Sequence, residues 1–87
     1  MTKIYTYCLF DGEDTFFGVY SSLTSVYRDA LHLTNKGPGH VHMLAPAGWE
    51  ETSLTNLRNL FKGKFDTIIV FRSGRHTAKI LKTKLKE

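Results

Sequence analysis

The chain has 87 residues, of which 41% are hydrophobic and 13% aromatic, and its formal net charge is +4. This composition is typical of one globular domain (residues 1–87), because disordered chains carry fewer aromatic residues. The single cysteine excludes an internal disulfide and a cysteine-based zinc cluster, and no apolar run approaches the roughly 18 residues of a membrane span. We therefore expect a cytoplasmic protein that has no contact with membranes.

The first predicted elements are two strands joined by a tight turn. The runs KIYTYCLF (residues 3–10) and TFFGVY (15–20) are rich in β-branched and aromatic residues, and an Asp-Gly pair lies between them. This pattern indicates an antiparallel hairpin. Tyr5 and Tyr7 share one face of the first strand. If that face is uncovered, its tyrosines would stack on bases, although a core or a dimer interface explains the same pattern.

Two amphipathic helices are predicted from apolar residues that recur three and four positions apart. The first lies within residues 21–37, and the second lies within residues 52–63, where Thr52 or Ser53 would cap its free N–H groups. The apolar stripe of the first helix consists of Leu23, Val26, Tyr27, Ala30 and Leu31. Both stripes are expected to pack on a sheet.

Two further strands are predicted from short apolar runs. HVHMLA (40–45) reads as a short strand, and the loop PAGW that follows would let Trp49 pack back on the second helix. DTIIVFR (66–72) is a continuous apolar run, which indicates a central strand covered on both faces.

The C-terminal segment SGRHTAKILKTKLKE (73–87) fits two structures. A helix over residues 75–86 would place Ala78, Leu81 and Leu85 on one face, whereas a strand would alternate its leucines with lysines. Because Lys and Leu favour helices, we predict the helix. The expected fold is then α+β (α/β), with a mixed sheet, the order ββαβαβα, an N-terminal hairpin and helices packed on the sheet.

The positive charge is concentrated in the last third of the chain. Residues 1–61 hold four basic and six acidic residues (net −2), whereas residues 62–87 hold eight basic and two acidic residues (net +6). This asymmetry predicts a polyanionic partner, bound by phosphate contacts where the last strand meets the predicted helix. The predicted nucleic-acid-binding residues are Arg72, Arg75, His76, Lys79, Lys82 and Lys86. A solvated basic surface without a partner is the alternative interpretation.

The remaining motifs do not indicate an enzyme. His40 and His42 point the same way on the predicted strand, but a metal site would need a third ligand from elsewhere, so we expect a surface pair, no metal and no cofactor. The same pair near a lysine suggests phosphodiester cleavage, which is the weakest of our hypotheses. The run SGRHTAK lacks the spacing of a P-loop, so nucleotide hydrolysis is not predicted.

The run FFGVYSSLTSVYRDAL (16–31) resembles the strand and capped helix that open many small phage and bacterial proteins. In size, single cysteine and basic end, the whole chain is similar to small early proteins of T-even-type bacteriophages, such as the toxin-neutralising RNA-binding factor. This resemblance implies RNA binding, self-association, and inhibition of a host defence ribonuclease or toxin in the host cytoplasm. It assigns no role to any residue.

Together, these patterns predict a non-enzymatic, RNA-preferring binding protein. A homodimer is expected because a modest core leaves apolar surface to bury. Low sequence specificity is expected because the chain offers charge rather than groups that read bases. The alternative is an inhibitor or adaptor that docks on a host enzyme through an exposed apolar patch.

Overall fold

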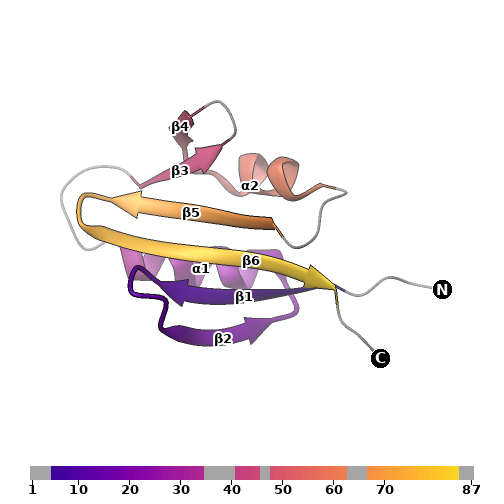
Figure 1. Cartoon of the computed structure of the whole chain (residues 1–87). Helices are drawn as coiled ribbons and strands as arrows, with labels where there is room; N and C mark the ends of the chain where they lie inside the picture. The colour runs from indigo at the N-terminus through magenta and orange to yellow at the C-terminus, as the bar shows by residue number, and fades with distance from the viewer. Residues whose placement is uncertain (1–4, 35–40, 46–47, 63–66, 85–87) are drawn as a thin grey trace.

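The computed structural model describes residues 5–34, 41–45, 48–62 and 67–84. Within them, six strands form one sheet in the order β2-β1-β6-β5-β3-β4, and all neighbouring strands are antiparallel. Two helices complete the fold, and α1 crosses behind β6 and β1 in Figure 1. The elements are β1 (Tyr5–Asp11), β2 (Phe16–Tyr20), α1 (Leu23–Thr34), β3 (His42–Ala45), β4 (Gly48–Glu51), α2 (Leu54–Phe61), β5 (Thr67–Ser73) and β6 (His76–Lys84).

The core lies between the two helices and one face of the sheet. Val26 and Ala30 from α1 and Leu57 from α2 are completely buried there, which confirms that both apolar stripes face the sheet. The sheet contributes Leu9, Met43, Ile69, Phe71, Ala78 and Ile80 to the same core. We call this side of the sheet the helix-covered face.

Polar contacts fix the helices where the sequence predicts caps. The Ser53 hydroxyl oxygen accepts a hydrogen bond from the backbone N–H of Asn56 at 3.0 Å, as expected for the cap of α2. The Tyr20 hydroxyl donates to a carboxylate oxygen of Asp29 at 2.6 Å and thereby joins β2 to α1. This bond to a carboxylate, together with burial, raises the pKa of Tyr20 to about 12.

The C-terminal segment is a strand, so the helix predicted over residues 75–86 is wrong. β6 lies between β1 and β5 and pairs with both along its length. Ala78, Ile80 and Lys82 are buried on the helix-covered face, and the residues between them face the other way. Two neighbouring strands satisfy the backbone groups of β6 on both sides, and this pairing outweighs the helix propensity of Lys and Leu.

The α+β class, the N-terminal hairpin and both helices are confirmed, whereas the mixed sheet and the order ββαβαβα are wrong. The observed order is ββαββαββ, because β4 occupies part of the predicted loop around Trp49 and β6 replaces the terminal helix. β5 is central, but Ile68 on it is 56% exposed, so it is covered on one face only. Residues 35–40, which include the predicted end of the first helix, lie outside the described residues.

None of the described helices is long and apolar enough to cross a membrane.

Candidate functional site on the open sheet face

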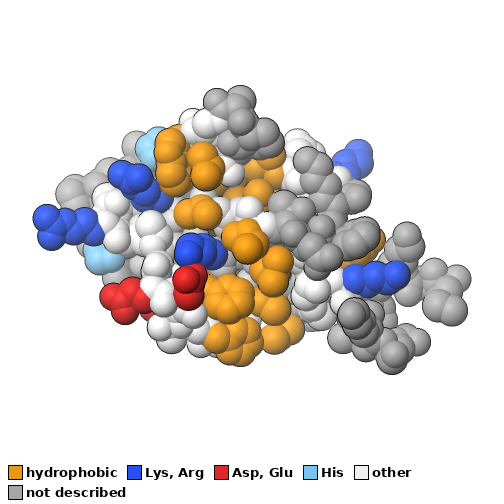
Figure 2. Space-filling model, viewed as in Figure 1, with side chains coloured by type: hydrophobic (Ala, Val, Ile, Leu, Met, Phe, Trp, Pro, Cys, Tyr) orange, Lys and Arg blue, Asp and Glu red, His pale blue; other side chains and the backbone are white. Residues whose placement is uncertain are grey.

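The sheet face opposite the helices, which we call the open face, carries no helix of the described part of the chain. Six large hydrophobic side chains are exposed in that part, and all except Phe17 lie on the open face, as strand alternation and register place them. Figure 2 looks onto this face and shows hydrophobic side chains across the sheet, with histidine and basic side chains next to acidic ones at the left end, which we call the basic end, and other basic side chains at the right. We therefore expect a binding partner to contact the open face.

A pocket of about 360 Å³ lies at this basic end of the open face. Its floor comes from three neighbouring strands, because Trp49 on β4 lies beside β3, and His42 on β3 pairs with Arg72 on β5. The Trp49 side chain is 46% exposed, and the guanidinium carbon of Arg72 is 5.4 Å from the centre of its ring. This cation–π contact holds a planar cation against a planar aromatic ring. The lining residues are His42, Trp49, Arg72, Ser73 and Gly74.

Two polar side chains that line this pocket, Ser73 and Arg72, differ in whether a ligand can reach them. Ser73 is buried, yet its hydroxyl makes no hydrogen bond with any described residue. The register places this hydroxyl on the helix-covered side of β5, the same side as Phe71, so it is out of reach of a ligand on the open face. Arg72 forms no ion pair within the described ranges, which leaves its donors free for an anion.

The turn between β5 and β6 adds charge at the same end of the sheet. Ser73 pairs with His76, so Gly74 and Arg75 form a two-residue turn, and Gly74 has φ 59°, a conformation that favours glycine. Arg75 and His76 are exposed at this turn. They line a second pocket of about 390 Å³, in which the carboxylates of Asp11 and Glu13 oppose anion binding.

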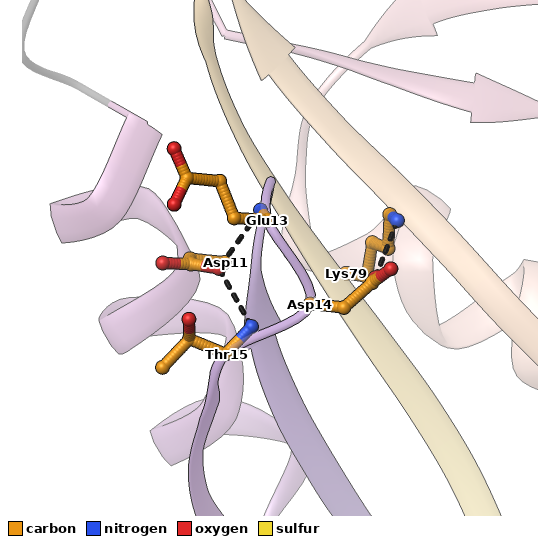
Figure 3. A network of polar contacts seen from close by, with 5 residues as sticks. All are labelled: Asp11, Glu13, Asp14, Thr15 and Lys79. Carbon is orange, nitrogen blue, oxygen red and sulfur yellow. Dashed lines mark hydrogen bonds and ion pairs between the residues drawn. The ribbon is translucent and has the colours of Figure 1, made fainter.

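Of the six predicted nucleic-acid-binding residues, Arg72, Arg75 and His76 lie at the same end of the sheet, with Arg72 in the Trp49 pocket and the other two in the second pocket, whereas Lys79 and Lys82 lie elsewhere. Lys79 lies further along β6 on the open face, and its ammonium contacts an Asp14 carboxylate oxygen at 2.6 Å (Figure 3). The same loop is held by Asp11, whose carboxylate accepts hydrogen bonds from two backbone N–H groups. The charge of Lys79 is therefore already neutralised by a neighbouring loop.

Lys82 points to the opposite side of the sheet. Its side chain is buried on the helix-covered face, its ammonium donates to the backbone carbonyl of Phe61 at 2.8 Å, and it lies 4.4 Å from the ring centre of Tyr5. Burial lowers the pKa of Lys82. The acceptor is at the C-terminal end of α2, where a cation is favourable. The predicted helix would place Lys79 and Lys82 on one side, whereas the observed strand puts them on opposite faces of the sheet, and Lys86 lies outside the described residues.

The prediction that Trp49 packs back on the second helix is wrong, because it lies exposed on the open face, and the sequence suggests a function for His42 only as a metal ligand or a catalytic group. The signal for Trp49 is weak, because a four-residue strand that follows Pro-Ala in the sequence is easily mistaken for a loop. Tyr5 and Tyr7 share the helix-covered face with Leu9, so the aromatic residues of the first hairpin on the open face are Phe10 and Phe16, with ring centres 5.6 Å apart.

Metal binding finds no support in the described residues. No three His, Cys, Asp or Glu side chains among them are grouped so as to hold a metal ion. His42 is exposed, and its predicted companion His40 lies outside the described ranges. Comparison of the chain with protein-family models, with curated proteins and with solved structures found no match.

Proposed function

We propose that this protein is a non-enzymatic binding protein that holds single-stranded RNA at the basic end of the open face. One observation carries the proposal: the half-exposed Trp49 ring lies in a pocket with the unpaired Arg72 guanidinium. An aromatic platform beside a cation is what an unpaired nucleotide needs, because the base stacks and the phosphate pairs with the charge.

A neighbouring basic residue would contact the next nucleotide of the same RNA strand. Arg75 follows Gly74 of this pocket directly and would contact the next phosphate, whereas Asp11 and Glu13 beside His76 disfavour a further one. We expect little sequence specificity, since stacking and phosphate contacts do not distinguish bases strongly.

The test is to measure binding of a fluorescein-labelled twelve-nucleotide oligo(U) RNA by anisotropy for the unaltered protein and for Trp49→Leu. Loss of one stacked base should weaken binding by about 1–3 kcal/mol, roughly 5- to 150-fold. The matched control is Phe16→Leu, since Phe16 is similarly exposed but lies on β2, at the edge of the sheet opposite to Trp49 on β4. Equal affinities for all three proteins would refute the proposed site, and an oligo(dT) of the same length tests the preference for RNA.

A second function is favoured by the aliphatic side chains elsewhere on the open face. Val19 and Ile68 are more than half exposed, and side chains of this kind suit a protein surface better than a base. A protein-only inhibitor or adaptor would dock on a host enzyme there. Inhibition of a host ribonuclease in the cytoplasm, implied by the phage resemblance, stays a prediction under either function.

A further inference from the structure

An apolar stripe crosses the half of the open face that lies away from the Trp49 pocket. It consists of Phe10, Phe16, Val19, Ile68 and Leu81, which come from β1, β2, β5 and β6. Cross-strand pairing makes it continuous, since Cys8 lies between Val19 and Leu81, and Leu81 pairs with Ile68. Figure 2 shows this stripe as hydrophobic side chains around one basic and one acidic group.

The stripe is large enough to form the centre of an interface. The four strands have 7, 5, 7 and 9 residues, so with a spacing of about 4.8 Å between strands and about 3.3 Å per residue they span on the order of 450 Å² of flat area. Accessible area exceeds flat area, so one such face approaches the roughly 800 Å² per partner of a standard interface. Apolar patches of this size on single proteins commonly mark interaction sites.

The charges within the stripe favour a second copy of the chain over a polyanion. Lys79 and Asp14 form an ion pair there, so among the described residues the stripe has one positive and one negative group and no free cation for a phosphate. A two-fold axis that passes beside this ion pair would bring each Lys79 towards the partner's Asp14. The surfaces are then complementary to themselves, as a two-fold interface requires, although each chain carries a net charge of +4.

We propose that a second copy of this chain covers the apolar stripe, so that two sheets pack face to face as in a β-sandwich. Aliphatic side chains of two sheets interdigitate well in that arrangement. The Trp49 pocket lies on β4 and β5, towards the other edge of the sheet, and each copy would keep its pocket outside the interface. This inference does not depend on RNA binding, because a dimer forms or fails to form in the absence of RNA.

The experiment is sedimentation velocity at 1–100 µM for the unaltered protein, Phe16→Ser and Phe17→Ser. The two residues are neighbours of the same type with 54% and 52% exposure, but only Phe16 belongs to the stripe. We expect a dimer whose Kd rises at least tenfold in Phe16→Ser and stays within twofold in Phe17→Ser. A Val19→Thr, Ile68→Thr variant, which keeps β-branching, should dissociate similarly.

Circular dichroism shows whether each variant is folded, and a melting temperature that rises with protein concentration provides a test on the unaltered chain. A strict monomer at 100 µM would overturn the inference and leave the stripe for a different protein. A dimer that both serine variants weaken equally, or that neither weakens, would overturn it as well, because its interface would then lie elsewhere.

Discussion

At the scale of single residues, Lys82 shows how a basic residue can look like a phosphate ligand and hold the fold instead. Its ammonium meets the last carbonyl of α2 and the ring of Tyr5, while the side-chain stem lies among core residues. In sequence it is one lysine in a row of alternating lysines. Position in a strand, not residue type, decides which of them reach solvent.

We predict that Lys82→Ala lowers the free energy of unfolding by about 2 kcal/mol, because it leaves the Phe61 carbonyl unpaired and a gap in the core. Lys84→Ala is the matched control, since Lys84 is exposed two residues further along the same strand and its loss should cost less than about 0.5 kcal/mol. Urea unfolding measures both. RNA affinity that falls more in Lys82→Ala than in Lys84→Ala, with the fold intact, would instead assign Lys82 a phosphate contact.

At the scale of elements, β6 explains why part of the fold was predictable and part was not. Both helices and the first hairpin have periodic apolar patterns with caps or turn residues, and such local signals suffice to identify them. β6 has mixed signals, since Ala78 and Leu81 fit a helix and the Leu-Lys alternation fits a strand. Its structure depends on pairing with β5, which directly precedes it, and with β1, which lies at the other end of the chain.

The loop between β1 and β2 packs closely on β6, and Gly12 is the point of contact. A Cβ atom at this position would overlap the Thr77 hydroxyl oxygen on β6. We predict that Gly12→Ala lowers the free energy of unfolding by about 1–3 kcal/mol, as overpacking does elsewhere.

Thr77→Ala in the same chain should recover more than half of that loss, since it removes the overlapping oxygen. A double-mutant cycle of thermal unfolding measures this coupling. Additive costs would contradict the contact. Gly18→Ala serves as the control in the same hairpin, because a Cβ there meets only the Tyr20 ring at an ordinary distance of 3.6 Å.

At the scale of the whole molecule, the charge asymmetry was visible in the sequence but its distribution in space was not. The sheet divides the basic C-terminal third between two faces and two ends, so that Arg72 and Arg75 lie at one end, Lys84 lies at the other, and Lys82 is buried. The Trp49 pocket unites three strands that are adjacent only in the folded sheet. No spacing rule along the chain reveals such a site.

This distribution predicts a salt dependence that depends on position as well as on charge. Arg72→Ala with Arg75→Ala removes two cations beside the Trp49 pocket, whereas Lys62→Ala with Lys84→Ala removes two exposed cations away from it. Each phosphate contact on a single strand contributes about 0.7 to the slope of log affinity against log salt. The arginine variant should therefore lose about 1.4 from the slope, and the lysine variant should lose little.

Anisotropy titrations with the oligo(U) RNA at 50–300 mM salt measure both slopes. If RNA lies at the basic end of the open face, only the arginine pair changes the number of counterions released, although both variants have the same net charge. Equal losses of slope would mean that RNA is attracted by the overall charge of the molecule and has no defined binding site. Unchanged slopes in both variants would remove phosphate contacts from this surface and leave docking of a protein partner as the function of the open face.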